Sequence, residues 1–198
     1  MPEIKKPMST IGFKNMVIAP VVSDTDEGTS YGEIVPVAGA IEATLTPENT
    51  EPEVQYADDA EYDVVNADPE VTFTTRMVDV PLEVQKIIFG CNIDANGVLL
   101  RSANDKPNYV AVGFKSEKAD HTFRYVWLYK VRAKPMTENY TTREGETITR
   151  QTPEIEWAAV KRVSDANYQA VADEGVNGFT PEKGATFLAS VYEPVESA

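Results

Sequence analysis

Alternation of apolar and polar residues with a period of two is the feature that most constrains this chain of 198 residues. Because successive side chains of a strand point to opposite faces, such stretches indicate strands with one face toward a core. The clearest are "AGAIEATLT", "EVTFTTRMV", "TFRYVWLYKVR", "NYVAVGFK" and "EIEWAAVKRV". Their β-branched and aromatic residues suit a packed, mostly antiparallel sheet.

The alternation also predicts which side chains share a face. The residues expected to face inward are Ile41, Ala43 and Leu45 in the first stretch and Val71, Phe73 and Met77 in the second. The stretch at 122–132 differs, because its second face, with Val126 and Leu128, is also half apolar. We expect that strand to be covered on much of both faces.

One segment departs from this pattern and indicates a helix. In "DVPLEVQKIIFG", Val84 and Ile88 lie one turn apart with Ile87 beside them, which is helical spacing. A proline suits the start of such a helix, and Gly90 suits its C-terminal stop. The sequence therefore predicts one short flanking helix over about 80–89, with those three apolar residues as its structural core.

The ends of the chain have the Pro, Gly and polar content of arms or loops. We therefore expect an N-terminal arm at 1–12, a β domain at 13–175 and a C-terminal arm at 176–198. No run of about 18 apolar residues occurs, so we expect no membrane span. The N-terminal residues also lack the apolar segment of a secretory signal.

Acidic residues are concentrated in the first part of the chain. Between Lys14 and Arg76 there are fourteen Asp and Glu and no Lys or Arg, whereas 81–198 holds sixteen acids and fourteen bases. The formal net charge is −14. This acidity argues against a surface that grips nucleic acid, because phosphate contacts need Lys and Arg.

The densest acidic stretch, "EVQYADDAEYDVVNADPE", holds seven acids in eighteen positions. The candidate acidic residues in and beside it are Glu51, Glu53, Asp58, Asp59, Glu61 and Asp63. If the strand at 53–57 is regular, its acids share a face with Gln55, opposite Val54 and Tyr56. We expect an acidic wall over an apolar core, although a merely solvated acidic surface is an alternative.

A metal-dependent hydrolase that uses Asp58, Asp59, Glu61 and Asp63 is a remote alternative. Neighbouring carboxylates of a strand diverge to opposite faces, which disfavours a convergent pair. A hydrolytic magnesium site also normally gathers cations that bind the substrate, and this part of the chain has none. We therefore predict no catalytic residue, no cofactor and no metal ligand.

Other motifs have simpler explanations. "NIDANG" imitates the start of a calcium loop, but Ala103 occupies the twelfth position, where a bidentate carboxylate is needed. An Asn-Gly turn is the expected structure there. His121 is the only histidine, and we expect it to be a solvated loop residue; without a second histidine no catalytic triad can be assembled around a different residue. Cys91 is the only cysteine, so no intrachain disulfide can form.

Several phrases, taken in order, resemble the major tail protein (tail tube protein) family of long, flexible-tailed phages. They are "GFKNMVIAPVVSDTDEGTSYG", "AGAIEATLTPE", "YADDAEY", "VDVPLEVQKIIFG", "PNYVAVGFKS", "FRYVWLYKVR", "RQTPEIEW" and "NGFTPEKGATFLASVYEP". The resemblance implies two packed antiparallel sheets, in a sandwich or barrel, with one flanking helix. It also implies a structural virion protein of the tail, made in the host bacterial cytoplasm.

The resemblance further implies homohexameric rings that stack into a tube. The expected partners are other copies of the chain, the tape-measure protein, the tail terminator and tail-tip proteins, and DNA passes through without specific binding. An acidic lumen or inter-ring surface would then repel the duplex. A contractile-type injection tube protein and another virion ring or decoration protein remain alternatives.

Overall fold

A computed structural model describes residues 8–48, 53–57, 60–65, 70–142, 150–176 and 178–195 of the chain. In chain order its elements are β1 (Lys14–Thr25), β2 (Gly28–Tyr31), β3 (Val35–Val37), β4 (Ala40–Glu48), β5 (Glu53–Ala57), β6 (Ala60–Val65), β7 (Glu70–Met77), α1 (Leu82–Phe89), β8 (Asn92–Ile93), β9 (Leu99–Leu100), β10 (Tyr109–Glu117), β11 (Phe123–Ala133), β12 (Glu154–Ala159), β13 (Gln169–Asp173) and α2 (Pro181–Thr186).

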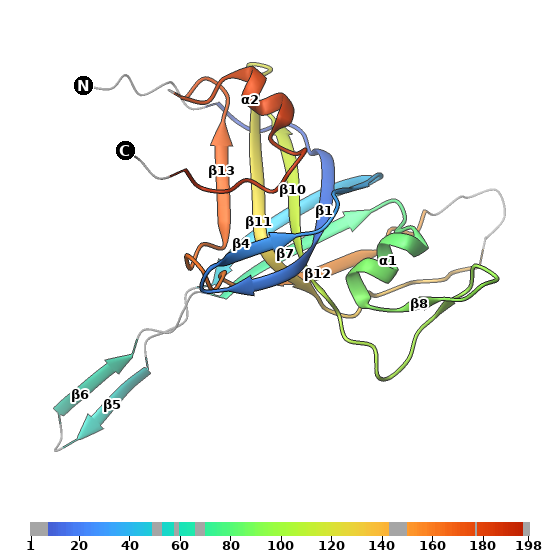
Figure 1. Ribbon diagram of the computed structural model, residues 1–198, viewed down its shortest axis with the longest axis horizontal. Coiled ribbons are helices and arrows are strands. Elements are labelled where there is room, and N and C mark those ends of the chain that lie inside the picture. Colours follow the sequence, from blue (N-terminus) through green and yellow to red (C-terminus); the bar gives the residue numbers. More distant parts are fainter. Residues whose placement is uncertain are drawn as a thin grey trace.

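Nine of the described strands form a continuous antiparallel sheet, in the order β2-β1-β10-β11-β12-β7-β4, with β13 beside β11 and β3 beside β1. The sheet is not closed. Strand β11 is shared between two groups of partners, since its first half pairs with β13 and its last residues pair with β12. Beyond this point β12, β7 and β4 cross the direction of β10, β11 and β13 (Figure 1).

The sheet therefore makes two packed layers. Phe73 of β7 and Phe114 of β10, which are not neighbouring strands, stack with their ring centroids 5.9 Å apart. The main core between the layers includes the predicted inward residues of β7, Val71, Phe73 and Met77, together with Ile18, Val112, Ile155 and Trp157. The predicted mainly β fold of two packed antiparallel sheets is confirmed.

Strand β11 is buried on both faces, as its sequence predicts. Tyr125 and Trp127 pack against Phe187 in a second cluster, whereas Leu128 and Val131 belong to the main core. The pairing with β10 shifts register between Leu128 and Val131, where β11 has one extra residue, and this accounts for the change of phase. One strand thus supplies the centre of both apolar clusters.

In β4 the predicted face is wrong for one residue. Ile41 is 46% exposed rather than buried. The pairing with β7 shifts register between Ala40 and Glu42, and such an irregularity inverts the alternation locally. Ala40 consequently packs against the core together with Ala43 and Leu45.

Helix α1 begins after a proline and ends at Gly90, whose φ of 69° is left-handed. Its position agrees with the prediction of a helix over about 80–89. Val84 and Ile88 are buried in the main core, and Ile87 is partly buried and packs against it. The apolar face of α1 therefore covers one end of the space between the layers (Figure 1).

A second short helix, α2, was not predicted. Phe187, which follows it, is buried in the cluster with Trp127, and the indole Nε1–H of Trp127 donates to the Phe187 carbonyl oxygen at 2.9 Å. Helix α2 and the chain after it therefore cover the outer side of the β10–β11 layer (Figure 1). The boundaries of the two arms stay predictions.

A buried arginine fixes the C-terminal segment. Arg162 is 2% exposed and lies 3.9 Å from the centroid of the Tyr129 ring. Its Nη1–H groups donate to both carboxylate oxygens of Glu193 at 2.9 and 2.8 Å, and the guanidinium also pairs with Asp165. A buried guanidinium needs such partners, because an unpaired buried charge is costly.

The contact between Gly113 and Trp127 gives a first prediction. A Cβ at Gly113 would lie 2.7 Å from the Trp127 ring, which is fully buried. We expect Gly113→Ala to lower the free energy of unfolding by about 1–3 kcal/mol through overpacking, measured by chemical denaturation. Gly12→Ala is the control, since its Cβ would meet Glu117 at an ordinary 3.7 Å. Equal stability of the two variants would contradict this packing.

The helix gives a second prediction. Ile88→Asp would bury an unpaired carboxylate in the core, so we expect a loss of several kcal/mol, about 3 or more, and loss of soluble protein. Val84→Asp should behave in the same way. The control is Leu82→Asp, because Leu82 is 41% exposed and an acid is favourable in the first helical turn. A folded Ile88→Asp variant would refute the core assignment.

Candidate assembly surfaces

One face of the folded sheet is polar and open to solvent. We call it the open sheet face, and it consists of the outward side chains of β4, β7 and β12 and of the end of β11. Its members are Glu42, Thr44, Thr46, Thr72, Thr74, Arg76, Arg132, Lys134, Glu154, Glu156 and Ala158, all exposed or half-buried. The other layer differs, because α2 and the C-terminal segment cover its outer side.

Arg76 occupies a central position on the open sheet face. The antiparallel register sets it opposite Glu42 of β4 on one side and opposite Glu154 of β12 on the other. Arg76 Nη1 lies 3.5 Å from Glu42 Oε2, and Nη2 lies 3.2 Å from Glu154 Oε2. The guanidinium is thus held between two carboxylates from neighbouring strands.

The remaining charges of this face are also engaged. Lys134 forms an ion pair with Glu156, and the Arg132 guanidinium lies 5.6 Å from the centroid of the Tyr109 ring. Between the charged rows, the register pairs threonine with threonine across β4 and β7. In the described part of the chain, the open sheet face therefore carries equal numbers of acids and bases, with hydroxyl groups between them.

Strand β4 also ends the sheet on one side. Its outer backbone edge pairs with no other described strand, and unpaired N–H and C=O groups can accept a strand from another chain. Ile41 at its start is 46% exposed, and Val78 nearby in the chain after β7 is 61% exposed. This edge therefore has the chemistry of a subunit contact.

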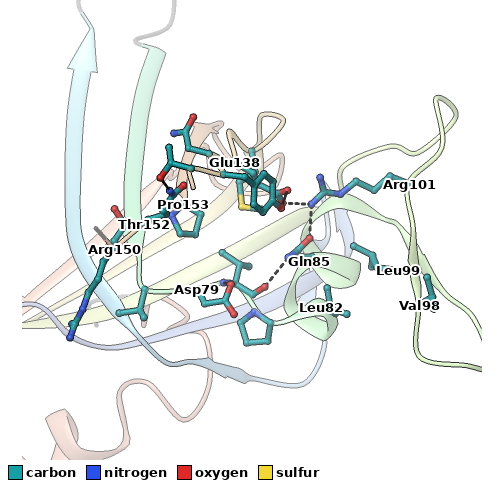
Figure 2. A pocket seen from close by; sticks show the side chains of 18 of the residues that line it. Asp79, Leu82, Gln85, Val98, Leu99, Arg101, Glu138, Arg150, Thr152 and Pro153 are labelled. Carbon is teal, nitrogen blue, oxygen red and sulfur yellow. Dashed lines mark hydrogen bonds and ion pairs between the residues drawn. The ribbon is translucent and has the colours of Figure 1, made fainter. Parts of the chain in front are cut away.

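A groove of about 1310 Å³ lies beside α1. Figure 2 shows Arg101 between Glu138 and Gln85 in its wall. Arg101 Nη2–H donates to Gln85 Oε1 at 2.7 Å and to Glu138 Oε1 at 2.6 Å, and Gln85 Nε2–H donates to the Val80 carbonyl oxygen at 2.8 Å. These polar groups satisfy one another, so the groove offers no unpaired base or nucleophile among them.

The groove's electrostatics follow from the same contacts. The Tyr140 hydroxyl donates to Glu138 at 2.7 Å and, with the Arg101 guanidinium, lowers the pKa of that carboxyl. The hydrogen bond to Glu138 raises the pKa of Arg101 and that of Tyr140. Each group is therefore held in its ordinary charge state near neutral pH, which suits a structural contact and not proton transfer.

The predicted acidic residues fall in and around a separate hairpin. Glu51, Asp58 and Asp59 lie outside the described residues. Glu53 is in β5, and Glu61 and Asp63 are in β6. In the described backbone β5 pairs with β6 and not with the core sheet, and Figure 1 draws the hairpin apart from that sheet. The pairing gives no support to an acidic wall over the core.

The remaining motifs are structural. Asp94 Oδ1 accepts the backbone N–H of Asn96 at 2.8 Å and of Val98 at 2.9 Å, so "NIDANG" forms a turn between β8 and β9. The His121 side chain is 83% exposed and lies 2.9 Å from Glu117. Among the described residues no group of acids, His and Cys could hold a metal ion. No described helix is long and apolar enough to span a membrane.

Sequence reasoning missed the row of Glu42, Arg76 and Glu154. Each residue stands on the polar side of an alternating stretch, so the faces could be predicted. The register between strands that are about 30 and 80 residues apart could not, because it depends on the bulge in β4 and on long-range pairing. The groove was missed because its walls come from four separate segments.

Comparison with known protein families gives a match over most of the chain. A protein-family model described as "Phage tail tube protein" matches residues 25–193. The match spans every described strand from β2 to β13 and includes α1 and α2. No curated protein matches the chain.

Proposed function

The chain belongs to the phage tail tube protein family, and from this premise we propose that it forms hexameric rings that stack into the conduit for phage DNA. Family membership makes it a structural component of the virion tail that assembles with its own copies, and not an enzyme. The observation that carries the proposal is the family match over most of the chain.

The open edge of β4 supports assembly into a ring. A heterologous contact repeated by rotation closes a ring and leaves no edge exposed. Pairing between subunits would also satisfy the outer N–H and C=O groups of β4. The exposed Ile41 and Val78 beside this edge would then be buried in the contact. We propose that β4 forms one side of the subunit interface.

The open sheet face supports a role as the channel lining. A water-filled channel needs a polar wall, and in the described chain this is the layer whose outer side carries no helix. Its threonine rows and paired charges meet that need. By family resemblance the channel first holds the tape-measure protein and later passes DNA, while a tail terminator and tail-tip proteins cap the tube. Synthesis in the host bacterial cytoplasm follows from the same resemblance.

The acids of the hairpin region supply net charge. Six copies would carry a formal charge of −84 per ring, six times the −14 of one chain. B-DNA carries a negative charge about every 1.7 Å along its axis, so acids near the lumen repel the duplex. Glu51, Glu53, Asp58, Asp59, Glu61 and Asp63 are proposed to line the lumen or the surface between rings.

Assembly gives a third prediction. Negative-stain microscopy of the purified protein with its tail-assembly partners should show rings or tubes. Ile41→Lys should leave a folded monomer but prevent ring formation, because an edge lysine opposes strand pairing. Val163→Lys, at a site of similar exposure (52%) away from that edge, should still assemble. Absence of rings from the unmodified protein would refute the proposed function, and assembly by Ile41→Lys would refute the β4 contact.

The acids give a fourth prediction. Replacing one of them with Gln removes only six charges per ring, so single variants should infect normally. Replacing several with Lys adds phosphate contacts in every ring. Such virions should look normal but eject DNA slowly. The defect should ease at high salt, because the screening length is about 8 Å at physiological ionic strength and becomes shorter as salt is added. A single Gln variant that assembles but cannot infect would indicate a specific site instead.

A further inference from the structure

On a surface that faces DNA, Arg76 could bind the phosphates of the duplex and hold it back. Its side chain is 47% exposed on the open sheet face, and a guanidinium can bind a phosphate through two parallel hydrogen bonds. Hexameric rings would repeat it six times in every ring along the channel. This step rests on the proposed function. If no acid lay beside it, an arginine at that position would give a passing duplex repeated phosphate contacts along the channel.

The structure gives Arg76 a carboxylate on each side. Glu42 and Glu154 are its direct cross-strand neighbours, on β4 and β12. They approach different nitrogens of the guanidinium, at 3.5 and 3.2 Å, and their side chains are themselves 58% and 50% exposed. Pairs as exposed as these contribute little to folding. Their effect is on what the surface presents, since each carboxylate lies beside a nitrogen that a phosphate would otherwise contact.

We propose that Glu42 and Glu154 mask Arg76 from DNA phosphates and so keep the open sheet face from adhering to the duplex. A phosphate that binds this guanidinium must compete with a carboxylate beside each of its two Nη groups, and both carboxylates repel it. Lys134 forms an ion pair with Glu156 one row away. The acids on this face thus work through their position beside a cation and not through total charge.

The test first compares two variants of equal charge. Glu42→Gln/Glu154→Gln unmasks Arg76, whereas Glu27→Gln/Glu33→Gln removes two exposed acids outside the open sheet face, one between β1 and β2 and one between β2 and β3. A third variant adds Arg76→Gln to the unmasked pair. Fluorescence anisotropy with a short DNA duplex, measured on folded monomer over a range of salt, reports binding. Circular dichroism checks that each variant is folded.

We expect the unmasked variant to bind the duplex about tenfold more tightly at low salt than the unmodified protein, with a salt slope steeper by about one unit. The Glu27/Glu33 control and the variant that also lacks Arg76 should show neither change. Equal binding by the unmasked and control variants would overturn the mask. If the double variant does not fold, Glu154→Gln alone should show a smaller gain in affinity for the duplex. No gain in that variant would also refute the masking of Arg76.

Assembled tails separate this inference from the proposed function. If the face lines the channel, virions with the unmasked variant should eject DNA more slowly than virions with the Glu27/Glu33 control. If monomers gain DNA binding but ejection is unchanged, the mask stands and the placement of the face in the channel is wrong. If neither changes, the mask itself is wrong.

Discussion

The burial of β11 on both faces is the constraint on which the rest of the structure depends. Trp127 and its neighbour Leu128 point into different apolar clusters, so the strand cannot lie at a surface and needs cover from two directions. The second layer of the sheet supplies one cover, and α2 with the C-terminal segment supplies the other. Because α2 and the C-terminal segment cover the outer side of β10 and β11, they do not cover the outer face of β4, β7 and β12. That face is exposed to solvent and must be polar.

The two parts of the chain handle negative charge differently. The region from Glu53 to Glu70 contains acids and no Lys or Arg, so in the proposed function these acids would act together through a field that salt screens. On the open sheet face acids and bases are equal in number, and Arg76 and Lys134 form ion pairs with acids of neighbouring strands. In the proposed function the first arrangement would repel a polyanion at a distance, whereas the second would remove adhesive contacts at the surface. A channel for DNA benefits from both, because repulsion alone weakens as ionic strength rises.

Local pattern predicted much of the fold, and long-range geometry accounts for what it missed. The alternation in 122–132 predicted a strand covered on both sides, and the spacing of Val84 and Ile88 predicted α1, because both signals lie within a few residues. Ile41 was misplaced because a bulge inverts the faces without a mark in composition. Helix α2 was missed because it is short and contains Gly184, a weak helix former. No pattern in one sequence specifies which strands meet, so neither the Arg76 row nor the groove could be derived.

The exposure of the Arg76 row decides what its role can be. Buried ion pairs fix a structure because breaking them leaves an unpaired charge in a poor solvent, as at Arg162. At about half exposure the same groups exchange partners with water and ions at little cost, so they add at most about 1 kcal/mol to folding. An incoming phosphate meets the same screening as the carboxylates, but it must diffuse in, whereas Glu42 and Glu154 are held beside the guanidinium by the sheet. That difference in local concentration is what favours the internal partner.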